Sequence, residues 1–103
     1  MRVLCVRFKS ATPMSELHAP WLGLAPDIAA VPGLIAKVWI QDGDQLGGLY
    51  TFRDQASLDA YAAGPIVSAL MANPVFSEFR IEQYDVLEDL SAITRGVPAA
   101  IAR

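Results

Sequence analysis

Cysteine, histidine and positive charge are all scarce in this chain of 103 residues, and each scarcity excludes a class of protein. Cys5 is the only cysteine, which excludes an internal disulfide and a multi-cysteine zinc site. His18 is the only histidine, which argues against a histidine-rich metal centre. No run of Lys or Arg occurs and the formal net charge is −3, so the electrostatic pattern of a nucleic-acid-binding protein is missing. We therefore expect no metal and no nucleic-acid partner.

Long apolar runs are also missing. None approaches the roughly 20 residues that cross a bilayer, and no basic region followed by an apolar stretch marks a secretory signal. We therefore expect a cytoplasmic protein with no membrane partner. Charged residues make up only 18% of the chain and hydrophobic residues 53%, whereas about a quarter charged is usual. Such a chain has more apolar surface than one small core can cover, which favours self-association.

What is present fits one α+β domain that spans residues 1–103, with a loose tail after about residue 95. Apolar alternation predicts strands, and apolar residues at steps of three and four predict helices between them. The strands are expected at residues 3–9, 34–41, 46–52 and 75–87. The order β-α-β-β-α-β is typical of a ferredoxin-like sandwich, in which helices cover one face of an antiparallel sheet.

The first helix is expected to follow Thr12 as N-cap, with Pro13 at its first position. Pro20 and Pro26 fall inside its apolar stripe, so we expect this helix to be kinked or broken. The stripe consists of Met14, Leu17, Trp21, Leu24 and Ile28.

Further along the chain, Asp54 is expected to cap a second helix, and Gly64-Pro65 to end it and begin another. In the last strand the apolar positions change parity between Ile81 and Tyr84, which predicts a β-bulge there. One more helical turn is expected in the segment EDLSAITRG.

The central hairpin has two chemically distinct faces. Its turn is expected at Asp42-Gly43 or Gly43-Asp44, as a type I′ turn with positive φ at both central positions. Either registration places Lys37 and Trp39 on the face that carries Gly48, Tyr50 and Phe52. The opposite face carries apolar residues that a monomer would leave wet, so we expect it to pack against a second copy of the chain. The residues of this face are Ala36, Val38, Ile40, Leu49 and Thr51, and its apolar character comes from Val38, Ile40 and Leu49.

The segments PGLIAKVWIQ, GGLYTFRDQASLDAYAAG and YDVLEDLSAI resemble the YdhR-like mono-oxygenases of the dimeric α/β-barrel superfamily. The resemblance covers about two-thirds of the chain, from the second strand to the last. It implies a homodimer whose two sheets form a barrel, and a pocket between the sheet and helices of each subunit. It also implies oxidation of phenolic or quinol-type aromatics by O₂ without flavin, haem or metal.

Such chemistry needs an apolar cavity, a proton acceptor and donors to a developing oxyanion. Trp39 can stack on a phenolic ring and donate its indole N–H, but it would equally serve as core filler. Tyr50 can donate to a phenolate, or be a core tyrosine with its hydroxyl at the surface. Phe52 is expected as a packing wall of the pocket. Lys37 either extends its ammonium to the edge of the sheet or attracts an anionic substrate.

The candidates outside the hairpin lie on the predicted helices. His18 is the candidate general base, because an unperturbed histidine side chain has a pKa near neutrality, although a lone helical histidine is usually a solvated boundary residue. Leu17 and Trp21 are expected to cover the pocket from the first helix, and Tyr61 from the second, where it could also be core.

We therefore hypothesise a cofactor-independent mono-oxygenase acting on a small planar phenolic or quinol-type aromatic. A non-catalytic binder of small hydrophobic metabolites is the first alternative. The second is an isomerase or dehydratase-type enzyme that transfers protons on the same fold.

Overall fold

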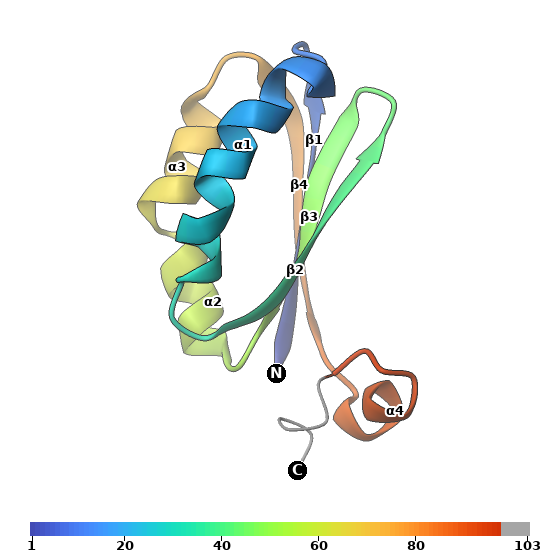
Figure 1. Ribbon diagram of the computed structural model, residues 1–103. Coiled ribbons are helices and arrows are strands. Elements are labelled where there is room, and N and C mark those ends of the chain that lie inside the picture. Colours follow the sequence, from blue (N-terminus) through green and yellow to red (C-terminus); the bar gives the residue numbers. More distant parts are fainter. Residues whose placement is uncertain (98–103) are drawn as a thin grey trace.

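The computed structural model describes residues 1–97 and forms a two-layer α+β domain (Figure 1). The strands pair antiparallel in the order β2-β3-β1-β4. Three helices, α1 to α3, cover one face of this sheet, and α4 lies beyond its end (Figure 1). The predicted ferredoxin-like order is therefore confirmed. The elements are β1 (Arg2–Ser10), α1 (Met14–Ala29), β2 (Leu34–Asp42), β3 (Gln45–Phe52), α2 (Gln55–Ala62), α3 (Pro65–Ala72), β4 (Phe76–Asp85) and α4 (Glu88–Ile93).

The β2–β3 hairpin has the register that its sequence predicts. Asp42 pairs with Gln45, so Gly43 and Asp44 are the two central turn residues. Of these two, Gly43 alone has a positive φ, +60°. This matches a type II′ turn, which needs a positive φ at its first central position only, and the expected type I′ turn was wrong. The strand faces are unaffected, because both turns close a two-residue loop.

Helix α1 differs from its prediction at its start, and of the kink or break expected at its prolines the structure excludes the break. Its N-cap is Pro13 rather than Thr12, and no side chain caps it. Thr12 instead forms a local turn, in which its N–H donates to Ser10 Oγ and its carbonyl accepts from the same hydroxyl. The helix runs unbroken through Pro20 and Pro26. Both prolines are exposed, so the carbonyls that lose a partner can turn to water.

Helices α2 and α3 begin as predicted. The Asp54 carboxylate accepts a hydrogen bond from the backbone N–H of Ser57 at 2.8 Å. Gly64 is the N-cap of α3, with Pro65 at the start of the helix, where its missing N–H costs no hydrogen bond. α2 and α3 are thus two short helices that meet at a sharp boundary.

Strand β4 contains the expected bulge, but at a different place. Arg7 of β1 pairs with Arg80, whereas Lys9 pairs with Ser77, so β4 has one extra residue between these pairs. Glu78, within this stretch, has a φ of +55°. The expected position between Ile81 and Tyr84 was wrong. Residues three apart on a strand lie on opposite faces by plain alternation, and no bulge is needed to separate them.

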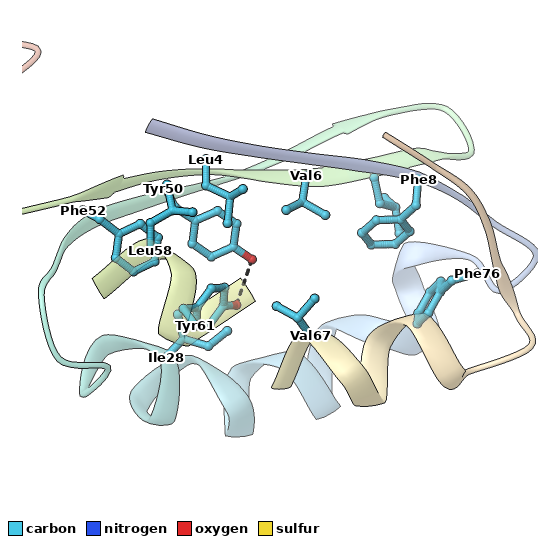
Figure 2. Close-up of a cluster of buried hydrophobic side chains, with 11 residues drawn as sticks. Leu4, Val6, Phe8, Ile28, Tyr50, Phe52, Leu58, Tyr61, Val67 and Phe76 are labelled. Atoms are coloured by element: carbon cyan, nitrogen blue, oxygen red, sulfur yellow. Dashed lines mark hydrogen bonds between the residues drawn. The ribbon is translucent and has the colours of Figure 1, made fainter. Parts of the chain in front are cut away.

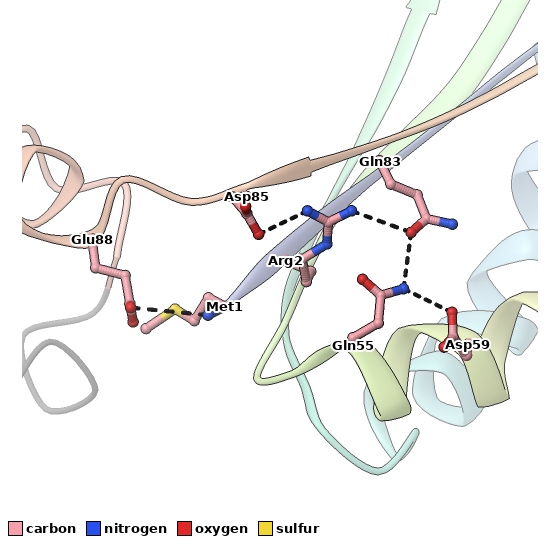
Figure 3. Close-up of polar contacts among 7 residues, drawn as sticks. All are labelled: Met1, Arg2, Gln55, Asp59, Gln83, Asp85 and Glu88. Atoms are coloured by element: carbon pink, nitrogen blue, oxygen red, sulfur yellow. Dashed lines mark hydrogen bonds and ion pairs between the residues drawn. The ribbon is translucent and has the colours of Figure 1, made fainter.

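The end of the molecule near the N-terminus is held by polar contacts (Figure 3). The Arg2 guanidinium on β1 donates to Asp85 Oδ1 of β4 at 2.8 Å. The Gln55 amide at the start of α2 donates to Gln83 Oε1 of β4 at 2.9 Å. Of the tail expected after about residue 95, Val97 is buried at 3% exposure, and residues 98–103 lie outside the described residues. No described helix is long and apolar enough to cross a membrane.

The outer face of the sheet, away from the helices, is divided into an apolar and a charged half. The apolar half, on β2 and β3, consists of Val38, Ile40 and Leu49, of which Val38 is 57% exposed. The charged half lies on β1 and β4, where Arg7 forms an ion pair with Glu82. The sequence therefore indicated the apolar half correctly, but apolar residues do not cover the whole outer face.

Candidate functional site

A cavity of about 380 Å³ lies between the sheet and the helices. Its sheet side comes from all four strands, with Phe76 as the contribution of β4, and its helix side comes from α1, α2 and α3. Most of its wall is aliphatic or aromatic, and this volume falls in the range of small-molecule pockets. The residues that line it from the helices include Trp21, Leu24, Ile28, Tyr61, Ile66, Val67 and Leu70.

Gly47 and Gly48 line the cavity, and a side chain at either position would clash with its neighbours. A Cβ on Gly47 would lie 2.2 Å from the backbone oxygen of Val6 on the neighbouring strand. A Cβ on Gly48 would lie 2.7 Å from Lys37 Cε and 2.9 Å from Tyr50 Cε1. The space above Gly48 is therefore partly taken by these two side chains. Gly48 allows the Lys37 and Tyr50 side chains to lie across the inner face of the sheet into the cavity, whereas the Cβ position of Gly47 is on the opposite face.

Lys37 lies on the helix-covered face and places its charge against two aromatic rings. Its Nζ is 3.3 Å from the ring centroid of Trp39 and 4.5 Å from that of Tyr50. None of the ion pairs among the described residues includes Lys37. Burial lowers the pKa of this ammonium from 10.5 to about 8. Lys37 is thus a mostly protonated cation at neutral pH that has aromatic faces but no carboxylate beside it.

Tyr50 and Tyr61 form a hydrogen-bonded pair inside the molecule (Figure 2). The Tyr61 hydroxyl on α2 donates to the Tyr50 hydroxyl on β3 at 3.1 Å. Burial raises the pKa of Tyr50, which is 5% exposed. Burial also raises the pKa of Tyr61. Both phenols stay neutral at physiological pH, and in this arrangement the proton of Tyr50 is free for another acceptor.

Trp39 and Trp21 lie between the cavity and a second hollow on the surface, which we call the outer groove. Their ring centroids are 5.6 Å apart, and both side chains line both spaces. The second hollow has a volume of about 300 Å³ and is also lined by His18, from α1. Trp39 is 39% exposed, which is not the burial of a core residue. The indole pair therefore forms the boundary between an inner cavity and an outer groove.

The structure brings five of the eight predicted site residues together. Trp21, Lys37, Trp39, Tyr50 and Tyr61 all line the cavity. The other three do not: His18 is exposed and lines the outer groove, while Leu17 and Phe52 belong to the packing around the core. Phe52, at 0% exposure, stacks on Tyr50 with the ring centroids 6.1 Å apart.

The helix-side wall from α3 was not predicted from the sequence. Ile66, Val67 and Leu70 line the cavity, and the spacings of four and three residues from Ile66 and Val67 to Leu70 place them on one side of a helix. This stripe was visible in the sequence once Pro65 was taken as the first helical residue. Figure 2 shows Val67 pointing from α3 towards Val6 on the sheet.

The chemistry of the cavity follows from its few polar groups. Its lining has no Asp, Glu or His among the described residues, and its polar side chains are one ammonium, two phenols, two indoles and the amide of Asn73. The described residues also contain no group of three or more His, Cys, Asp or Glu side chains that could hold a metal ion. The cavity can therefore surround a planar apolar molecule and donate hydrogen bonds or positive charge to an oxygen on it.

The sequence matches the family described as "Putative mono-oxygenase ydhR" over residues 3–97. The chain therefore belongs to the ydhR family of mono-oxygenase-like proteins. No protein of curated function matches its sequence.

Solved structures of the same fold come from several bacteria. A protein of unknown function from Nitrosomonas europaea is 28% identical, with a TM-score of 0.70 over 84% of this chain and 88% of that one. SnoaB, a cofactor-independent oxygenase from Streptomyces nogalater, is 13% identical, with a TM-score of 0.66 over 82% and 91% of the chains. The heme-degrader MhuD from Mycobacterium tuberculosis, solved with two hemes bound, is 18% identical, with a TM-score of 0.62 over 84% and 96%. At these identities the last two show a shared fold.

Proposed function

We propose that this protein is a cofactor-independent mono-oxygenase that oxidises a small planar phenolic or quinol-type aromatic with O₂ inside the cavity. The observation that carries the proposal is the cavity wall itself, in which Trp39, Tyr50 and Lys37 meet on one face of the β2–β3 hairpin. Membership of the ydhR family and the fold shared with SnoaB support it.

In the proposed reaction the substrate first loses a proton from oxygen or from an activated carbon to water, since no carboxylate or imidazole of the described residues lines the cavity to accept it. The resulting anion gives one electron to O₂, and the substrate radical and superoxide combine to form a carbon–oxygen bond. After protonation the O–O bond breaks: one oxygen atom stays as a carbonyl, and the other leaves as water with the remaining hydrogen of that carbon. The substrate supplies all the electrons, so no further reductant is needed.

The cavity residues have separate tasks in this scheme. Trp39 stacks on the substrate ring, and Tyr50 donates its free proton to the developing oxyanion, because Tyr61 already donates to Tyr50. The apolar wall excludes water from the radical pair. His18 has no role in this scheme, because it lies in the outer groove, beyond the Trp21–Trp39 pair.

Oxygen uptake by purified, colourless protein tests this function. A panel of hydroquinones and anthrones is incubated with the protein with and without O₂, and O₂ consumption and quinone formation are followed. Substrate-dependent uptake that falls at least about tenfold in Tyr50→Phe is expected, since removal of one oxyanion donor commonly costs that much or more. Saturable binding without any uptake would show a non-catalytic binder instead. Product formed equally without O₂ would indicate proton-transfer chemistry.

The proposal includes a cytoplasmic homodimer in which the apolar half of the outer face packs against its twin. The exposed Val38 and Leu49 support this arrangement, because a monomer would leave them in water. Sedimentation equilibrium at micromolar concentration should give twice the mass of the 11.1 kDa chain. A single species at the monomer mass would contradict it. Val38→Lys should shift the wild-type dimer towards monomer.

A further inference from the structure

Lys37 is a half-buried cation that lines the cavity, and no anion among the described residues balances its charge. The chain as a whole is acidic, with a formal net charge of −3, yet no carboxylate of the described residues lines the space that Lys37 enters. The ion pairs among the described residues lie elsewhere, mainly at Arg2, Arg7 and Lys9. A charge removed from water and left unpaired destabilises a folded protein.

The surroundings of Lys37 hold its ammonium in place but do not neutralise it. Trp39 and Tyr50 present their ring faces at 3.3 and 4.5 Å from Nζ, which offsets part of the desolvation. Gly48 leaves the room that the lysine stem needs, because a Cβ there would lie 2.7 Å from Cε. The strand register, the glycine and the two rings together fix a positive charge beside an apolar cavity.

We infer that Lys37 is the anion-binding residue of this cavity, and that its ligand is a planar aromatic carrying a negative charge on or next to the ring. A phenolate, an enolate or an aromatic carboxylate has this chemistry. The aromatic wall takes the ring, and the ammonium gains the partner that the protein itself does not supply. This inference rests on the proposed function in one respect, the use of the cavity as a ligand site. It adds that Lys37 selects the ionised form of the substrate, which is the form that reduces O₂.

Two fluorescent probes of the same ring system test this inference. 8-Anilinonaphthalene-1-sulfonate is an anion, and N-phenyl-1-naphthylamine is its neutral counterpart. Wild-type protein near pH 7 should bind the anion at least about tenfold more tightly than the neutral probe, as expected for one charge-assisted contact. In Lys37→Met, which keeps the apolar stem, this ratio should fall to about one. In Lys37→Arg it should persist.

The pH dependence gives a second readout that does not depend on the folding of Lys37→Met. The titratable groups that line the cavity with Lys37 are Tyr50 and Tyr61, whose pKa values are both raised, so Lys37 is the first of the three to change its charge as the pH rises. The anion preference of the wild type should disappear as the pH rises from about 7 to about 10, while Lys37→Arg keeps it, since its guanidinium stays charged.

Equal binding of the two probes by the wild type, or an unchanged ratio in folded Lys37→Met, would overturn the inference. Oxygen uptake separates it from the proposed function. A Lys37-dependent anion preference without O₂ uptake from any quinol would leave the inference standing and refute the oxygenase. Oxygen uptake by a protein with no anion preference would support the oxygenase and refute the inference about Lys37.

Discussion

The two ends of the space between sheet and helices are built in opposite ways, although the same hairpin supplies both. The end near the β3–α2 connection is filled by fully buried side chains of one hydrophobic core cluster. They are Phe52 of β3, Leu4 of β1 and Leu58 of α2. At the other end the strands carry Gly47 and Gly48, and a cavity of about 380 Å³ remains. Close packing is the normal state of a protein interior. The filled end therefore holds the fold together, and the hollow end is where a ligand fits.

The comparison also explains why the polar groups gather at one end. The filled end offers aliphatic and phenyl side chains, whereas the hollow end has Lys37, Trp39 and the two hydrogen-bonded tyrosines. Buried polar groups are kept at a cost in stability, and all of these border the cavity. Stability and ligand binding should thus respond to different mutations, and the predictions below follow from that separation.

The largest effect is expected at the filled end. Leu58→Ala removes a fully buried side chain of α2 and leaves a void under the sheet. We expect the free energy of unfolding to fall by about 2–5 kcal/mol, as for other buried leucines. Urea denaturation measures this loss. A fall of less than about 1 kcal/mol would mean that this end is as loosely packed as the other.

Gly48→Ala should have the next largest effect on stability, because its added Cβ overfills the hollow end. The new Cβ would lie 2.7 Å from Lys37 Cε and 2.9 Å from Tyr50 Cε1. We expect a loss of about 1–3 kcal/mol together with a weaker preference for anionic probes. Gly23→Ala in α1 is the matched control. Nothing lies within 4 Å of its added Cβ, and in a helix it should stabilise by about 0.5–1 kcal/mol. Equal effects of the two changes would contradict the geometry at Gly48.

The charge on Lys37 should appear as a pH dependence of stability. Its pKa is about 8 in the folded protein against 10.5 for a free side chain, so between these values the unfolded chain binds more protons. The wild type should therefore become more stable relative to Lys37→Met as the pH rises from about 8 to 10.5. Allowing for partial exposure, the change is about 1–2 kcal/mol. The difference in unfolding free energy between the two proteins, measured across this range, should be flat below pH 8. A difference independent of pH throughout would show that Lys37 is solvated.

The smallest effect on stability is expected for Trp39→Phe. Trp39 is 39% exposed, so its replacement should change the free energy of unfolding by less than about 1 kcal/mol. The affinity for an aromatic ligand should fall about three- to tenfold, the equivalent of one aromatic contact. Phe52→Leu serves as the control from the filled end, because it should lower stability and leave affinity unchanged. A stability loss in Trp39→Phe without loss of affinity would make Trp39 a core residue.

The sequence predicted the fold well where short-range rules decide it. Asp54 and Gly64-Pro65 mark helix boundaries by local chemistry, and a two-residue turn at Gly43 fixes which residues share a face. The errors lie where tertiary context prevails. Pro20 and Pro26 do not break α1, and the bulge of β4 lies at Glu78, where no sequence signal marks it.

The candidate site could be predicted on the hairpin and much less on the helices. Strand parity alone places Lys37, Trp39 and Tyr50 together. The rotation of α1 about its axis decides which of its residues reach the cavity. Apolar periodicity fixes this rotation only to within about one residue. Trp21 lines the cavity, whereas Leu17 and His18 do not. The void itself depends on how α3 packs over the sheet, and an apolar stripe does not reveal that.

The measurement that tests the central claim most directly is an NMR titration of uniformly ¹⁵N-labelled protein with 2-naphthoate, a planar aromatic anion. The account predicts saturable shifts at the Trp39 indole N–H and at the Gly47 and Gly48 amides, with the amides of Phe52 and Leu58 unmoved. Saturable shifts centred on the filled end, or no saturable shift at Trp39 and Gly48, would contradict it.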